Sequence, residues 1–165
     1  SISAGATVIK ISVLEEAQKL TIVVTDNGKG MSKEQVCKVI DPFFTTRTTR
    51  KVGMGIPLFK MEAEMTGGSF EIESDLNQGT KVTATFITTH LDTLPLGDIN
   101  ATVWLLITCN PDLDFIFYRR IGHLDFTLNT KELKDILGEI PLNAPDVSQW
   151  LKDYLTEQTA LLHGG

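Results

Sequence analysis

The chain has 165 residues, of which 42% are hydrophobic and 22% are charged, and its formal net charge is −6. This composition is typical of an ordinary globular protein, and the negative charge gives no general reason to expect nucleic acid or an anionic membrane as a partner. Two isolated cysteines are too few for a disulfide framework or a zinc site. We read them as structural thiols, which predicts a cytoplasmic protein, and we find neither an apolar run of membrane-spanning length nor a signal-peptide core at the start.

The first elements are two strands and a short helix. Runs rich in β-branched residues predict strands at 7–13 and 20–26, joined by a hairpin connection over 15–19. Ser32 followed by Gln35 has the spacing of a capping box, in which each residue satisfies a backbone N–H of the other. This spacing predicts a short helix that begins at Ser32.

A second helix and two more strands follow. The helix is predicted from Pro57, because proline is tolerated in a first helical turn, and it should end at the glycines 67–68. Alternating segments predict strands at 69–74 and 81–88. The order strand, strand, helix, loop, helix, strand, strand predicts an α+β fold in which helices cover one face of a mixed sheet.

The pattern changes at residues 90–98, which contain proline and glycine without any hydrophobic period and are predicted to be a linker. The next run, 99–110, is compatible with a helix or a strand, and we favour a helix. A hairpin is predicted over 114–129 and a short helix over 130–138.

The last helix has the clearest pattern of this second half. Its apolar residues fall on one stripe with helical spacing: Val147, Trp150, Leu151, Tyr154 and Leu155. With Phe115, Phe117 and Tyr118 of the hairpin, this stripe could form a small second core. We therefore expect a domain at 1–89 and a small α+β accessory domain of unknown role at 99–165. A block so small buries little surface, so it should pack on the first domain or on a second copy of the chain.

The segment Asp26-Asn27-Gly28-Lys29-Gly30 follows a predicted buried strand. A carboxylate at such a strand end can accept a hydrogen bond from an exocyclic amine such as that of adenine, and glycines let the backbone approach a flat ring. The same letters are also common in ordinary turns. Alone, the segment favours the turn.

A second glycine pair, Gly53 and Gly55, precedes the helix predicted from Pro57. Backbone N–H groups at a helix N-terminus attract phosphate, and Arg47, Arg50 and Lys51 lie just upstream. A hinge beside a solvated basic loop is the alternative. The sequence lacks both the phosphate-loop lysine motif and the full dinucleotide-binding glycine motif, which disfavours those folds.

Five segments, taken in order, carry a family resemblance. They are "VVTDNGKGM", "DPFFTTR", "VGMGIPL", "GGSFEIES" and "QGTKVTATF". Together they resemble the ATP-binding domain of the gyrase, Hsp90, histidine kinase and MutL superfamily, over about residues 1–88. "DPFFTT" after the "D-x-G-x-G" box points to the histidine-kinase branch, and so to bacterial signal transduction. The resemblance implies an α/β sandwich of the Bergerat type, with ATP and Mg²⁺ as ligands of the full-length protein.

The resemblance also implies roles for particular residues. Asp26 matches the aspartate that binds the adenine amino group, and Thr80 matches the threonine that supports the adenine pocket. The unpatterned stretch after the paired phenylalanines matches a lid that closes over the triphosphate, and its hydroxyl and basic residues would donate to phosphate oxygens. The implied nucleotide contacts are Asp26, Gly28, Gly30, Met31, Phe44, Thr45, Thr46, Arg47, Lys51, Val52, Gly53, Met54, Gly55, Ile56 and Thr80.

Two departures from the family pattern qualify this assignment. The second glycine box usually has a further glycine where this chain has Lys51, so the lid is stiffer there or Lys51 contacts phosphate. The family's helix with the Mg²⁺-binding asparagine would fall before Ser1. The sequence thus predicts a fragment that binds ATP weakly and has negligible activity.

Three functions remain open at this stage. The chain is the ATP-binding part of a sensor histidine kinase, or a stand-alone regulatory ATP-binding protein that acts on a partner through its C-terminal part, or an ATPase of the MutL or chaperone type. The lid sequence places the third last. A protein partner or a homodimer through residues 99–165 is compatible with the first two.

Overall fold

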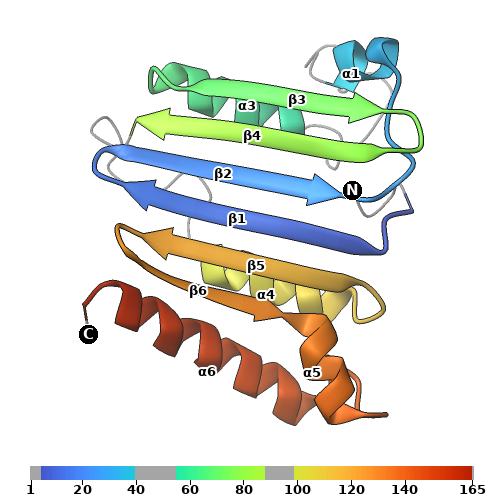
Figure 1. Cartoon of the computed structure of the whole chain (residues 1–165), viewed down its shortest axis with the longest axis vertical. Coiled ribbons are helices and arrows are strands. Elements are labelled where there is room, and N and C mark those ends of the chain that lie inside the picture. Colours follow the sequence, from blue (N-terminus) through green and yellow to red (C-terminus); the bar gives the residue numbers. More distant parts are fainter. Residues whose placement is uncertain (1–4, 40–54, 88–98, 165) are drawn as a thin grey trace.

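The computed structural model describes residues 5–39, 55–87 and 99–164, with backbone only at 39 and 55–59. Six strands form one sheet in the order β3-β4-β2-β1-β5-β6 (Figure 1). Their bounds are β1 Val8–Glu16, β2 Lys19–Asp26, β3 Ser69–Asp75, β4 Gly79–Ile87, β5 Asp114–Ile121 and β6 Leu124–Asn129. Neighbouring strands are antiparallel except β1 and β5, which are parallel, so the predicted α+β fold with a mixed sheet is confirmed.

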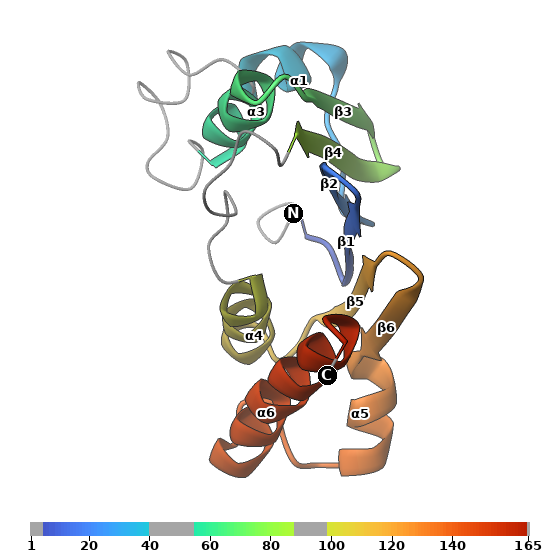
Figure 2. The same cartoon turned by 90° about the vertical axis from the view of Figure 1, so that its left-hand side faces the viewer.

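The helices lie mainly on one face of this sheet, as the sequence predicted (Figure 2). Their bounds are α1 Lys33–Val39, α3 Gly55–Met65, α4 Ile99–Cys109, α5 Thr130–Leu137 and α6 Pro145–Leu162. The segment whose pattern allowed a helix or a strand is thus the helix α4. The capping box before α1 is also confirmed: the Ser32 hydroxyl accepts from the Gln35 backbone N–H at 3.2 Å, and the Gln35 side chain accepts from that of Ser32 at 2.8 Å.

The first hairpin is tighter than the sequence predicts. We expected a connection over 15–19, but Glu16 pairs with Lys19, so that only Ala17 and Gln18 form the turn. Ala17 has a φ of 50°, a left-handed conformation that the sequence does not announce, because alanine rarely adopts it. The register of the two long strands determines the turn here, and β1 extends three residues beyond its predicted end.

Both halves of the chain share one hydrophobic core, rather than the second core that the sequence suggested. Phe115 and Phe117 of β5 are buried in the same cluster as Ile9 and Val13 of β1 and Leu20 of β2. The expectation that the C-terminal block packs on the first is therefore confirmed, through the parallel ladder between β1 and β5. The domain bounds 1–89 and 99–165 remain a prediction, since a shared sheet does not show where each block could fold alone.

Two aromatic residues that the sequence analysis assigned to a second core lie outside the shared core. Tyr118 points to the opposite face from Phe117, because side chains alternate along a strand, and its hydroxyl donates to Asp125 at 3.0 Å. This hydrogen bond raises the pKa of Tyr118 above its ordinary value. Trp150 is 47% exposed and stacks on Tyr154 with 5.0 Å between ring centroids.

A buried polar network ties the C-terminal helices to the sheet. Arg119 of β5 is only 5% exposed and pairs with Glu15 of β1 at 3.3 Å. The Arg119 guanidinium also donates to the Asn100 side chain of α4 at 3.4 Å, and Asn100 donates in turn to the Thr159 hydroxyl of α6 at 2.8 Å. Because a buried charge is costly when unpaired, this network favours one arrangement of the four elements.

Candidate functional site

The end of β2 brings together the residues that the sequence placed around adenine. Asp26 is the last residue of β2 and lies directly opposite Thr80 of β4 in the antiparallel register. The carboxylate is buried, with 6% of the residue exposed, and its Oδ1 accepts from the backbone N–H of Gly28 at 2.9 Å. A buried acceptor is thus held at the strand end by the loop that follows it.

Two glycines allow the loops at this end to lie against each other. A Cβ at Gly30, whose φ is +69°, would collide with the carbonyl oxygen of Asp75. A Cβ at Gly79, whose φ is +90°, would collide with the carbonyl oxygen of Asp26. Both positions therefore require glycine, for the left-handed backbone and for the lack of a side chain. The loop 27–31 lies directly on the β3–β4 turn as a result.

One residue at this site was missed by the sequence analysis. The Ser74 hydroxyl of β3 accepts from the Met31 backbone N–H at 2.8 Å and lies 2.8 Å from the Thr80 hydroxyl and 3.0 Å from the Gly79 carbonyl oxygen. A signal was present: Phe70 and Ile72 alternate toward the inner face, and Ser74 is the next residue in that series. A polar residue in an inward-facing apolar series indicates a side chain that is hydrogen-bonded inside the protein.

Replacing Ser74 tests whether this hydroxyl holds the site together. We expect Ser74→Ala to lower the free energy of unfolding by about 1–2 kcal/mol, because the partly buried Met31 N–H loses its acceptor. Urea denaturation followed by circular dichroism measures this. Ser69→Ala, at an exposed position of the same strand, is the matched control and should stay within about 0.5 kcal/mol of the original protein. Equal stability of all three proteins would contradict the role given to Ser74.

The predicted contacts divide into three groups. Asp26, Gly28, Gly30, Met31 and Thr80 come together at one end of the sheet. Gly55 and Ile56 form the start of α3. The remaining predicted contacts lie outside the described residues: Phe44, Thr45, Thr46, Arg47, Lys51, Val52, Gly53 and Met54.

A shallow pocket of about 170 Å³ opens at this end of the sheet. It is lined by Thr25, Asp26, Glu73, Ser74, Asp75, Gln78, Gly79, Thr80 and Lys81. Pockets for drug-sized ligands usually hold roughly 300–1,000 Å³. This pocket is smaller, and its lining includes side chains from both faces of the sheet, because Thr25, Glu73 and Lys81 alternate with Asp26, Ser74 and Thr80.

The described residues give no metal centre and no membrane helix. Nowhere among them do three or more histidine, cysteine, aspartate or glutamate side chains converge on one point. None of the described helices combines the length and the apolar character needed to cross a bilayer.

The first half of the chain is similar to known proteins. The family model "Histidine kinase-, DNA gyrase B-, and HSP90-like ATPase" matches residues 1–90. Sporulation kinase D of Bacillus subtilis is 37% identical over 81 residues, which cover 49% of this chain and 15% of that protein. Sensor histidine kinase ZraS of Escherichia coli is 30% identical over 76 residues, which cover 46% of this chain and 16% of that protein. The chain thus spans about a sixth of the length of these curated relatives.

A solved structure extends the likeness beyond the matched half. The N-terminal domain of a DNA repair protein superimposes with a TM-score of 0.54 at 13% identity. The superposition covers 84% of this chain and 54% of the other. At this identity the likeness concerns the fold alone.

Proposed function

Because the chain belongs to the histidine kinase-, DNA gyrase B- and HSP90-like ATPase family, we propose that it is the ATP-binding module of a histidine-kinase-like signalling protein. The observation that carries the proposal is the buried carboxylate of Asp26, held opposite Thr80 at the end of β2. The relatives reported above are a sporulation kinase and a sensor histidine kinase, which favours signalling over other uses of ATP.

Adenine recognition follows from the chemistry of this strand end. An ionised carboxylate only accepts hydrogen bonds, and the exocyclic amine of adenine is a donor. The Asp26 position is buried, so a hydrogen bond made there meets little competition from water. The neighbouring glycines would let the flat base approach the backbone, with Thr80 beside it.

The triphosphate would lie toward the start of α3. The N-terminus of a helix carries partial positive charge and attracts phosphate, and α3 begins at Gly55. We propose phosphate contacts for the lid residues named above, with Lys51 either contacting phosphate or stiffening the lid. We assign no Mg²⁺ ligand among the described residues. Bound Mg²⁺ would neutralise part of the phosphate charge.

A regulatory ATP-binding protein that acts on a partner is the second candidate. It is favoured by the ladder between β1 and β5, which joins the strand next to the nucleotide site directly to the C-terminal block. A partner bound to that block would then sense the state of the nucleotide. A cytoplasmic location and bacterial signalling belong to both candidates.

Comparing two nucleotides tests the adenine assignment. Inosine triphosphate carries a carbonyl oxygen where ATP carries the amino group, so it would place an acceptor against the Asp26 carboxylate. We expect ATP to displace a fluorescent ATP analogue at a concentration at least about tenfold lower, because an unmatched polar pair in a buried site costs more than 1.4 kcal/mol. The two nucleotides carry the same triphosphate, which controls for phosphate binding. Equal competition would remove Asp26 from base recognition.

A further inference from the structure

An apolar pocket between α5 and α6 lies at the end of the molecule farthest from β3 (Figure 1). Its volume is about 320 Å³, and its lining is mostly apolar: Leu133, Ile136 and Leu137 from α5, and Asp146, Val147 and Trp150 from α6. All of these residues lie outside the part of the chain that the family model matches. The pocket is therefore independent of the proposed nucleotide site.

Large apolar side chains around this pocket face solvent. In its lining, Ile136 is 80% exposed and Trp150 is 47% exposed. Isolated exposed apolar residues are common, but a group that surrounds a hollow marks an interaction surface. Trp150 is held in place by stacking on Tyr154, so this wall of the pocket is ordered before a partner arrives. Ready-placed aromatic anchors are typical of the centres of interfaces.

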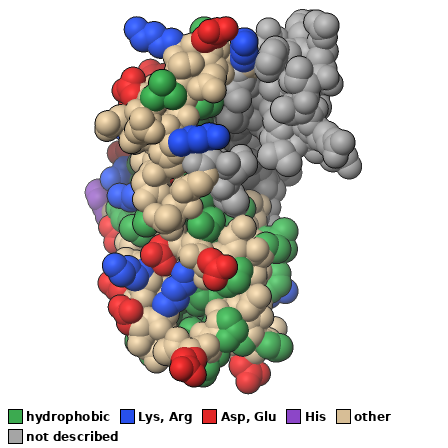
Figure 3. Space-filling view, turned by 90° about the vertical axis from the view of Figure 1, so that its right-hand side faces the viewer, with side chains coloured by type: hydrophobic (Ala, Val, Ile, Leu, Met, Phe, Trp, Pro, Cys, Tyr) green, Lys and Arg blue, Asp and Glu red, His purple; other side chains and the backbone are tan. Residues whose placement is uncertain are grey.

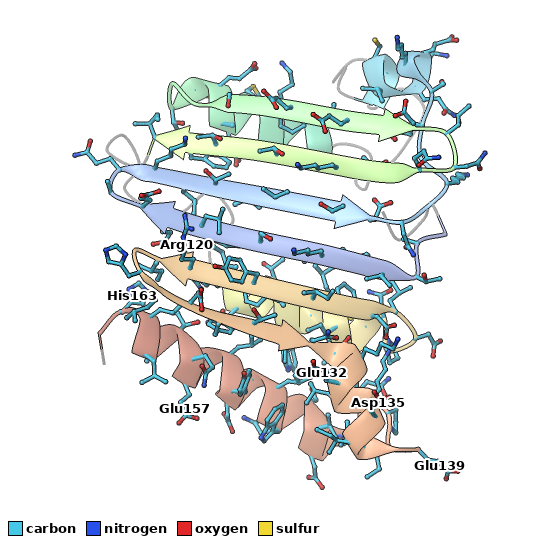
Figure 4. All side chains as sticks on the ribbon, viewed as in Figure 1. Arg120, Glu132, Asp135, Glu139, Glu157 and His163 are labelled. Atoms are coloured by element: carbon cyan, nitrogen blue, oxygen red, sulfur yellow. The ribbon has the colours of Figure 1, made fainter. Side chains whose placement is uncertain are left out.

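Acidic side chains outnumber basic ones on and between the two helices that form the pocket. Figure 4 shows Glu132, Asp135 and Glu139 along α5 and just beyond its end, and Asp146 lines the pocket itself. No ion pair within the described ranges 5–39, 55–87 and 99–164 involves any of these four. Figure 3 shows hydrophobic side chains beside acidic ones at this end of the molecule. The rim thus offers negative charge to a ligand.

Of the three lysines on α5 and α6, Lys131 lies beside Glu132 and offsets part of this charge, whereas the other two are engaged elsewhere. The Lys134 Nζ donates to the Leu113 carbonyl oxygen at 2.8 Å and to Asp114 at 2.9 Å. The ammonium of Lys152 lies 5.6 Å from the ring centroid of Trp104, on the side of α6 that faces α4. Both cations are engaged away from the rim, and neither lines the pocket.

We propose that this pocket docks a basic amphipathic helix of a partner protein, with one large apolar side chain of that helix seated between Ile136 and Trp150. An apolar hollow with an acidic rim matches a helix that carries leucine-like residues on one side and lysine or arginine on the other. A second copy of this chain, with a net charge of −6, would meet like charge at the rim. Anionic membranes and nucleic acids are disfavoured for the same reason.

A designed peptide tests the proposal without knowledge of the natural partner. The probe is a fluorescein-labelled helical peptide of about 14 residues, near the length at which isolated helices become stable, with leucines on one face and lysines on the other. Fluorescence anisotropy measures its binding to the whole chain. We expect saturable binding that weakens about tenfold as ionic strength rises from about 0.05 M to about 0.5 M, because salt screens the rim charges. The matched peptide with glutamate in place of lysine should not bind.

Variants then locate the binding. Ile136→Glu should weaken peptide binding at least about tenfold, because it removes an anchor contact. The double substitution Glu132→Lys and Asp146→Lys, of which Asp146 lines the pocket, should weaken it about fivefold and remove most of its salt dependence. Met65→Glu is the control: Met65 is 79% exposed, close to the 80% of Ile136, but lies on α3. Circular dichroism of each variant reports whether the chain remains folded.

Several results would overturn the proposal. They are the absence of saturable binding, equal binding of the glutamate peptide, or equal loss in Met65→Glu and Ile136→Glu. Self-association of the chain that Ile136→Glu abolishes, seen by sedimentation, would assign the pocket to a second copy. Binding to vesicles that contain phosphatidylserine would assign it to a membrane surface. Failure of ATP binding with intact peptide binding would contradict only the proposed nucleotide site.

Discussion

Asp26→Asn is expected to lower the affinity for ATP by about a hundredfold while leaving the fold intact. Asparagine keeps the shape of the side chain, and its oxygen can still accept the Gly28 N–H that the carboxylate accepts at 2.9 Å. The NH₂ group of the asparagine then faces the adenine amino group, and both groups are hydrogen-bond donors. Losing a charge-assisted hydrogen bond in a buried site costs about 1.5–3 kcal/mol, and 1.4 kcal/mol corresponds to a factor of ten.

Isothermal calorimetry with ATP measures this effect, and thermal denaturation shows whether the variant is folded. Removing a negative charge should strengthen binding of an anionic ligand in general, so a loss of affinity has the opposite sign to any unspecific charge effect. Asp112→Asn, on the exposed turn before β5, measures that general effect. Similar affinities for both variants would falsify the assignment of Asp26 to adenine.

Gly30→Ala is expected to lower the free energy of unfolding by about 3 kcal/mol. The left-handed backbone at this position costs an alanine about 1–2 kcal/mol. The new Cβ would also meet the Asp75 carbonyl oxygen, so the loop and the β3–β4 turn must separate. Overpacking of this kind costs typically 1–3 kcal/mol more. The two terms together exceed the effect of most single substitutions.

Gly122→Ala provides the control that separates these two terms. Gly122 has a φ of +62°, close to the +69° of Gly30, but a Cβ there would meet nothing within 4 Å. It should therefore show only the backbone cost, about 1 kcal/mol. Urea denaturation of both variants measures the difference. Equal losses would mean that the loop does not lie as closely on the β3–β4 turn as the structure places it.

The local elements could be predicted because each has its own signal in the sequence. Alternation or β-branched residues identified the first four strands, a hairpin pattern identified the last two, and the spacing of Ser32 and Gln35 identified the start of α1. The facing positions of Asp26 and Thr80 followed from the family resemblance and agree with the register of β2 and β4. In these cases the side chains themselves carry the information, through burial or through a hydrogen bond to nearby backbone.

The partner of β1 on its outer side could not be predicted. Alternation shows which face of a strand is buried, but the ladder is made by backbone groups that every residue has. Nothing in the sequence of β5 shows that it pairs with β1 rather than with another strand, and the two strands are about a hundred residues apart.

The exposure of Trp150 was missed for a related reason. An apolar stripe indicates the side that faces the core, but not how much of its width the core covers.

The parallel ladder between β1 and β5 has a consequence for synthesis in the cell. Val8 lies opposite Asp114 and Glu15 opposite Ile121, so the outer edge of β1 has no partner until the ribosome has added about a hundred further residues. At 5–20 residues per second, this interval lasts roughly 5–20 s. An unpaired edge of apolar residues such as Ile9, Ile11 and Val13 is a template for pairing with other chains. We therefore expect the nascent chain to be prone to pair with other chains during these seconds, and a product terminated before β5 to aggregate more readily than the whole chain.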